Sequence, residues 1–132
     1  MSNNYSIKHL SAVCVMNVQD ITVLYVEDEA ITRMYFSRML SKRVKEVLLA
    51  KDGQDGLEKV EESAPDLIIT DINMPVMDGR EMVRRLRENG CAIPIIALTA
   101  YEYTKDELCV NDVIRKPVNL ERLMSSISSA MP

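Results

Sequence analysis

The chain has 132 residues, of which 47% are hydrophobic and 27% charged, and this composition is typical of one globular domain with a single core. A net charge of −4 and a pI near 5.0 argue against binding to nucleic acid or to an anionic membrane surface. No apolar stretch approaches the roughly 20 residues that would span a bilayer.

The cysteines and the histidine do not form a metal or catalytic pattern. Cys14, Cys91 and Cys109 are widely spaced without a CxxC pair, and His9 is the only histidine. This arrangement predicts free thiols in a reducing cytoplasm rather than disulfides or a zinc site. A single histidine close to the N-terminus also argues against a Ser/His/Asp triad.

Residues 1–19 are polar at first and then carry a short apolar run over residues 12–16. The run is too short for a signal peptide, and no small-residue cleavage site follows it. We therefore expect a leader or linker over residues 1–19 and one domain over residues 20–131.

The first expected strand and helix come directly after this segment. Residues 21–26 are almost uniformly apolar and predict a strand buried on both faces. Three acids follow it, Glu27, Asp28 and Glu29, which is more than helix capping requires. Apolar residues then recur at helical spacing and predict an amphipathic helix that ends near residue 41: Ile31, Met34, Tyr35 and Met39.

The next segments predict a second strand, a turn and a second helix. Residues 44–50 predict a weaker strand, and residues 52–56 are expected to form a turn. Leu57, Val60 and Ala64 then mark one face of a helix, which Pro65 closes.

A third strand is expected over residues 66–71, with Asp71 at its carboxyl end. Carboxyl ends of strands are where open α/β sheets bind ligands. Asn73 and Pro75 cannot extend the strand, because proline has no N–H for the ladder. A third helix is expected from Gly79, and Asn89-Gly90 stops it. Its inward residues are expected to be Met82, Val83 and Leu86, and its solvated face to be Arg80, Arg84, Arg85 and Arg87.

The last third of the chain repeats this alternation. Residues 95–98 predict a fourth strand followed by Thr99, and residues 104–110 predict about two helical turns. Residues 112–115 predict a fifth strand that ends at Lys116. Asn119 is expected to cap a final helix whose apolar positions are Leu120, Leu123, Met124 and Ile127.

Alternating strands and helices predict a parallel sheet with helices on both faces, and right-handed crossovers place every strand's carboxyl end at one edge. The residues expected there are Glu27, Asp28, Asp71, Thr99 and Lys116. This set suits phosphoryl transfer onto a carboxylate, with Asp71 as the nucleophile. The three acids, with the backbone carbonyl of Asn73, could hold Mg²⁺, while Thr99 and Lys116 could bind phosphoryl oxygens.

Four motifs carry a resemblance to a known family: Val26–Glu29, Thr70–Gly79, Leu98–Ala100 and Lys116-Pro117. With these motifs in this order, residues 20–131 resemble the receiver domain of two-component response regulators. The resemblance implies a doubly wound, flavodoxin-like α/β fold with five parallel strands in the order 2-1-3-4-5.

The resemblance also implies partners and roles. Asp71 would accept a phosphoryl group from a sensor histidine kinase, a phosphotransfer protein or a small phosphodonor, with Mg²⁺ at Glu27, Asp28 and Asp71. Thr99 would be the switch hydroxyl, and Asn73 and Tyr101 fall where the family tunes the phosphoryl lifetime. The domain would signal to a downstream protein without turnover of an external substrate. The family often reports phosphorylation by dimerising, which leaves a homodimer open.

Two features depart from the family pattern. Val113 occupies the position of the family's aromatic switch residue, for which Tyr101 or Tyr103 could substitute, although packing is the simpler role for either. Thr99 and Lys116 are separated by 116 − 99 = 17 positions, fewer than usual, which predicts a shortened fourth helix. That helix belongs to the family's output face, so the departure bears on output and not on the acceptor site.

Two other classes of function remain open. An aspartyl-phosphate phosphatase usually has a second acid two residues after its nucleophile, where this chain has Asn73, and it usually needs a cap domain. A receiver-like scaffold that binds partners without phosphorylation is the second alternative. P-loop and dinucleotide motifs are absent, and no DNA-binding segment is expected after Met131.

Overall fold

Five short apolar segments pair into one parallel sheet in the order β2-β1-β3-β4-β5, as the sequence predicts. The computed structural model describes residues 17–131. The strands are β1 (Thr22–Val26), β2 (Glu46–Ala50), β3 (Leu67–Asp71), β4 (Ile95–Thr99) and β5 (Asp112–Arg115). Every residue of β3 and β4 is buried, because both strands lie inside the sheet with helices on each face.

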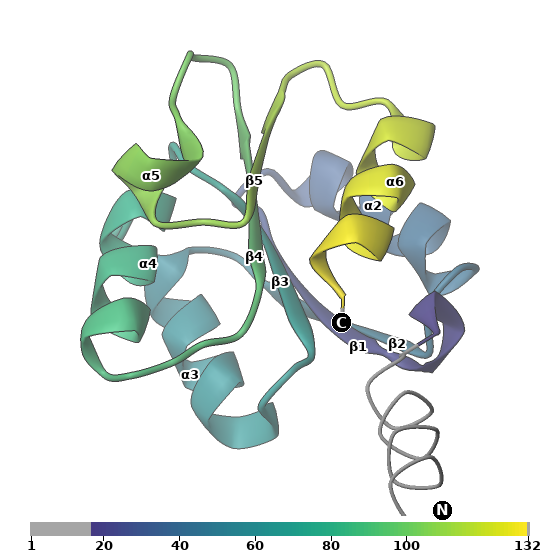
Figure 1. Cartoon of the computed structure of the whole chain (residues 1–132), viewed down its shortest axis with the longest axis horizontal. Helices are drawn as coiled ribbons and strands as arrows, with labels where there is room; N and C mark the ends of the chain where they lie inside the picture. Colours follow the sequence, from purple (N-terminus) through teal and green to yellow (C-terminus); the bar gives the residue numbers. More distant parts are fainter. Residues whose placement is uncertain (1–16, 132) are drawn as a thin grey trace, which may run out of the picture.

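Helices cover both faces of the sheet (Figure 1). One face is covered by α3 (Gly53–Ser63), α4 (Gly79–Glu88) and α5 (Lys105–Leu108), and the other by α2 (Ala30–Ser41) and α6 (Leu120–Ala130). This is the doubly wound, flavodoxin-like arrangement. The fourth helix of the expected series is α5, which has only four residues, so the predicted shortening is confirmed.

The buried face of α2 differs from the prediction. Ile31, Met34 and Tyr35 are 80%, 54% and 58% exposed, whereas Leu40 is fully buried and Phe36 packs against the same core. The helix therefore has apolar side chains on two faces, and the packing of Phe36 and Leu40 against the sheet decides which face is buried. Ile31, Met34 and Tyr35 of the predicted stripe instead form an exposed apolar surface.

The expected turn over residues 52–56 is also wrong. Asp52 caps α3 by accepting a hydrogen bond from the Asp55 amide, so the helix begins at Gly53. Gly53 and Gly56 allow close packing, since an added Cβ would lie 2.6 Å from the Met77 carbonyl oxygen and 2.6 Å from Met82 Sδ, respectively. Leu57 and Val60 pack against the core as predicted, but Ala64 is the exposed C-cap, with φ of 44°.

The inward face of α4 matches the prediction, but one residue of its arginine row does not. Arg87 is half-buried and donates to the carbonyl oxygens of Cys91 and Ile93 at 3.0 and 2.8 Å and to that of Cys109 at 3.0 Å. It therefore ties α4 to the segments before β4 and after α5.

The N-terminal segment lies mostly outside the described residues, including His9 and Cys14. The part described ends in a short 3-10 helix, η1 (Val18–Asp20), directly before β1. Cys91 and Cys109 are free thiols. Between residues 17 and 131, no helix has the length and apolar character needed to cross a bilayer.

Candidate functional site

The carboxyl ends of four strands bring the predicted site residues to one edge of the sheet. Asp71 and Thr99 are the last residues of β3 and β4, while Glu27 and Lys116 directly follow β1 and β5. The Lys116 amide donates to the Thr99 carbonyl oxygen at 2.8 Å, which joins the ends of β4 and β5. Parallel pairing of short strands thus places these residues together, as the alternating sequence pattern predicts.

Three carboxylates form a cluster at this edge. One oxygen each from Glu27, Asp28 and Asp71 lie within 4.8 Å of one another. Glu27 and Asp71 are buried and Asp28 is exposed, so the cluster opens to solvent on one side. Oxygen donors with concentrated negative charge fit a hard cation such as Mg²⁺, which takes few protein carboxylates and completes its shell with other oxygens.

The electrostatics of Glu27 reflect this crowding. Burial raises the pKa of its carboxyl to about 7; the hydrogen bond from the Glu29 amide opposes this, the Asp71 charge adds to it, and Lys116 opposes it again. The Glu29 amide donates to Glu27 Oε2 at 3.2 Å. Desolvation and repulsion from Asp71 thus disfavour the charged form of Glu27, as expected where a cation binds.

Lys116 pairs directly with Asp71. Its Nζ lies 3.0 Å from Asp71 Oδ1, which also accepts a hydrogen bond from the Ile72 amide at 2.9 Å. The lysine is partly exposed whereas the aspartate is buried. The ammonium group therefore offsets the carboxylate charge while remaining able to contact a group that enters from solvent.

Thr99 and Asn73 flank the cluster differently. Thr99 is fully buried, and its Oγ1 accepts a hydrogen bond from the Tyr101 amide at 3.1 Å. Among residues 17–131 its hydroxyl hydrogen has no acceptor, so the group could donate to a ligand. Asn73 is exposed, two residues after Asp71, in the segment between β3 and α4.

A glycine at the start of α4 allows that segment to fold back on Asp71. The Gly79 amide donates to the Ile72 carbonyl oxygen at 2.8 Å. A Cβ at Gly79 would overlap the Asp71 carbonyl oxygen. Asp78 caps the helix by accepting from the Glu81 amide at 2.8 Å. In the Asp-Gly pair, Asp78 therefore caps the helix and Gly79 allows the backbone of the helix to approach Asp71 closely.

Two residues near the cluster were not identified from the sequence. Arg33 Nη1 donates to the backbone carbonyl oxygens of Glu27 and Asp28, at 2.7 and 3.2 Å, and so holds the acidic loop against α2. In the sequence, the signal for this contact is an arginine in the first turn of the helix that follows the three acids. Tyr25, fully buried in β1, was interpreted only as an apolar strand residue.

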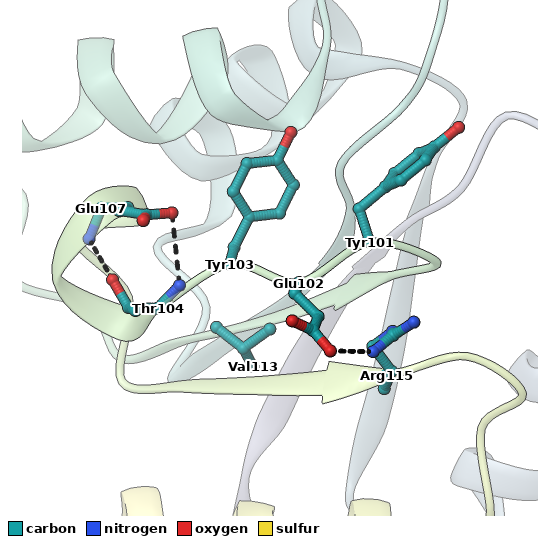
Figure 2. Close-up of a pocket in the computed structure, with 7 residues that line it drawn as sticks. All are labelled: Tyr101, Glu102, Tyr103, Thr104, Glu107, Val113 and Arg115. Atoms are coloured by element: carbon teal, nitrogen blue, oxygen red, sulfur yellow. Dashed lines mark hydrogen bonds and ion pairs between the residues drawn. The ribbon is translucent and has the colours of Figure 1, made fainter.

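The region around Val113 contains a cavity of about 490 Å³, lined also by Tyr101, Tyr103 and Arg115. Figure 2 shows Val113 on β5 and the two tyrosine rings projecting away from that strand. Tyr103 lies under the Arg80 guanidinium, 5.7 Å from the ring centre, and Tyr101 is 60% exposed. Tyr103 is therefore engaged in packing against Arg80, and both tyrosines line the cavity beside Val113.

The region's other contacts hold its rim in place. Glu102 pairs with Arg115 at 3.0 Å, and Thr104 and Glu107 form a reciprocal capping box at the start of α5 (Figure 2). The capping box thus stabilises α5, which has only four residues.

Comparison with known sequences identifies relatives over most of the chain. Residues 23–128 match the family described as the response regulator receiver domain. The response regulator MprA of Mycobacterium leprae (strain TN) is 34% identical over 114 residues, which are 83% of this chain and 50% of that protein. MprA of Mycobacterium ulcerans (strain Agy99) is 32% identical over 116 residues. The chain spans about half the length of these curated relatives.

Solved structures show the same fold. Vibrio cholerae chemotaxis protein CheY4 aligns with a TM-score of 0.77 at 31% identity, covering 89% of this chain and all of that chain. The response regulator domain of Thermotoga maritima CheB aligns with a TM-score of 0.74 at 29% identity, covering 84% of this chain and 96% of that chain.

Proposed function

This chain belongs to the family of response regulator receiver domains, and from that premise we propose that Asp71 accepts a phosphoryl group. The donor would be a phosphohistidine on a sensor histidine kinase or phosphotransfer protein, or a small phosphodonor. The observation that carries the proposal is the Lys116–Asp71 ion pair, at 3.0 Å, beside a cluster of three carboxylates.

The nucleophile is assigned to Asp71 Oδ2. The Lys116 ammonium and the Ile72 amide both contact Oδ1, and this fixes the carboxylate plane. In the transfer step Oδ2 forms a bond to phosphorus as the phosphorus–nitrogen bond to the donor imidazole breaks, and the imidazole nitrogen keeps the electron pair. Such transfer depends mainly on positioning and on charge neutralisation.

Glu27, Asp28 and Asp71 would hold Mg²⁺, with the backbone carbonyl of Asn73 as a further oxygen donor. When bound, the ion neutralises charge on the carboxylates and on phosphoryl oxygens. Arg33 keeps the carbonyl groups of Glu27 and Asp28 turned toward α2, so that their side chains remain at the sheet edge.

Thr99 and Lys116 would bind the phosphoryl oxygens. Lys116 needs only a small movement from Asp71 Oδ1, and the Thr99 hydroxyl would turn away from the Tyr101 amide. Release of the Tyr101 amide would let residues 101–104, which line the Val113 cavity, change their conformation. We expect phosphorylation to reach α5 through this segment, without an aromatic switch.

A protein partner would approach over α2. This helix begins two residues after Asp28 and exposes Ile31, Met34 and Tyr35, which form an apolar surface beside the site. We propose that the phosphodonor protein docks there, that the domain acts in the cytoplasm, and that it passes the signal to a downstream protein without turnover of an external substrate.

Beryllofluoride with Mg²⁺ tests the acceptor assignment, because it mimics a phosphoryl group on a carboxylate. We expect it to shift the amide NMR signals around residues 71 and 99 in the wild type and not in Asp71→Asn. Identical spectra for the two proteins would remove the proposal and favour a scaffold that is not phosphorylated.

Lys116→Ala separates metal binding from phosphoryl binding. This variant should still bind Mg²⁺, because the three acids remain, but it should lose phosphorylation by acetyl phosphate, because the ammonium no longer neutralises the phosphoryl oxygens. Unchanged phosphorylation would show that the lysine has another role.

A further inference from the structure

Tyr25 lies directly beneath the acidic cluster. It precedes Glu27 by two residues on β1, so both side chains project from the same face of the sheet. In the register of β1 and β3 it pairs with Ile69, which precedes Asp71 by two residues. Tyr25 and Ile69 thus form the layer on which Glu27 and Asp71 rest.

The position of the ring is fixed by its surroundings. Tyr25 is fully buried, and its ring meets the Phe36 ring of α2 edge-on, with centres 6.1 Å apart. Strands pair with β1 on both sides, so the backbone of this residue is also held. The hydroxyl therefore has a defined location at the inner side of the site.

Two buried oxygen atoms at this location lack partners. Within residues 17–131, neither the Tyr25 hydroxyl nor Glu27 Oε1 makes a hydrogen bond, although each is shielded from solvent. Both residues line one cavity of about 340 Å³ between α2 and the segment after β5, together with Phe36, Lys116 and Val118. One of these atoms is a donor and the other only an acceptor, so they are chemically complementary.

Packing alone does not account for a hydroxyl here. A buried hydroxyl without a partner is unfavourable, and phenylalanine would fill the same apolar layer without that penalty.

We propose that Tyr25 is a positioning residue for the metal site: its hydroxyl donates to Glu27 Oε1, directly or through one water in the cavity. Because the Glu29 amide already holds Oε2, this second hydrogen bond would fix the carboxylate in one orientation toward Asp28 and Asp71. The inference rests on the proposed function, since it assumes that Glu27 is a ligand of Mg²⁺.

The consequence is a measurable change in metal affinity. Hydrogen-bond partners behind a metal ligand orient it, and their loss typically weakens binding by about 10–100-fold. We expect Tyr25→Phe to weaken Mg²⁺ binding by about tenfold, the lower end of that range, because the Glu29 amide remains. Isothermal titration calorimetry on the full chain measures the dissociation constant directly.

Tyr35→Phe is the matched control. It removes the same atom from a tyrosine of α2 that contacts Phe36 edge-on but is 58% exposed. Its Mg²⁺ affinity should equal that of the wild type. If Tyr25→Phe also binds Mg²⁺ as the wild type does, the positioning role is wrong even though the metal site stands. If the wild type itself does not bind Mg²⁺, the proposed function fails first and this inference fails with it.

Two further readouts distinguish positioning from a merely structural role. With ¹³C at the tyrosine ring carbon that bears the hydroxyl, the Tyr25 signal should move on addition of Mg²⁺ while the Tyr35 signal stays in place. In a Glu27→Ala background, Tyr25→Phe should no longer affect Mg²⁺ binding. An equal loss of affinity in both backgrounds would mean that the hydroxyl acts through the general fold, and would overturn the proposal.

Discussion

The buried Glu27 carboxylate destabilises the metal-free protein at neutral pH, and Glu27→Gln measures by how much. Burial, and to a smaller extent the charge of Asp71, raises the pKa of Glu27 from its ordinary 4.5 to about 7. The hydrogen bond from the Glu29 amide and the charge of Lys116 oppose this rise. Because the folded-state pKa is the higher one, the fold favours the neutral carboxyl. The stabilisation of the folded state by the neutral Glu27 carboxyl is fully present below about pH 4.5 and is lost as the pH rises through about 7.

The size of the effect follows from the two pKa values. A change from 4.5 to about 7 corresponds to about 3 kcal/mol, since one pKa unit is worth about 1.4 kcal/mol. Since Asp71 and Lys116 share the interaction, we expect Glu27→Gln to stabilise the metal-free protein by about 1–3 kcal/mol at pH 8. At pH 5 the wild-type carboxyl is mostly protonated in the fold, so the gain should fall to less than about half of that value.

Urea unfolding in EDTA at the two pH values measures this difference. Glu29→Gln, which removes the same charge from an exposed neighbouring side chain, controls for net charge. With Mg²⁺ added, the order should reverse, because the ion stabilises the protein that binds it more tightly. A Glu27→Gln protein no more stable than the wild type at pH 8, or equally stabilised at both pH values, would refute the reasoning.

Three other substitutions test separate parts of the structure. Gly79→Ala should cost more than about 2 kcal/mol in urea unfolding and abolish phosphorylation, because its Cβ would overlap the Asp71 carbonyl oxygen; wild-type stability would show that the close approach is not needed. Ile31→Ser should change stability by less than about 0.5 kcal/mol, since the side chain is 80% exposed, yet slow transfer from a phosphohistidine protein and not from acetyl phosphate. Arg87→Ala should lower the free energy of unfolding by about 1–2 kcal/mol, because its contacts with carbonyl oxygens are lost. Arg84→Ala, at an exposed ion pair of the same helix, should lower it by less than about 0.5 kcal/mol. Equal losses would place both arginines on the solvated face.

The sheet and the site edge could be predicted because their signals are local. Buried parallel strands are short apolar runs, and the polar residue that ends each run marks the carboxyl edge. The alternation with helices then leaves few topologies. Asp71, Thr99 and Lys116 could be placed together on this basis, and the family match supports the fold, although their roles and the Mg²⁺ site remain predictions.

Features that depend on packing between distant elements could not be predicted. The apolar residues of α2 are found on two faces, and only the contacts of Phe36 and Leu40 with the sheet decide that Ile31 is exposed. The glycines of α3 predict a turn when the sequence is considered locally. Their role in close packing cannot be seen there, because Met77, which approaches Gly53, lies after β3 in the chain. Arg87 is similar: its carbonyl partners include Cys109, 22 residues away.

The central claim is that the strand-end cluster makes one aspartate able to carry a phosphoryl group, and acetyl phosphate with Mg²⁺ tests it most directly. Intact-protein mass spectrometry followed by peptide mapping should find a single added phosphoryl group, located on Asp71, that requires Mg²⁺ and is absent in Asp71→Asn. A wild-type protein that gains no phosphoryl group under these conditions, or gains it on another residue, would contradict the account.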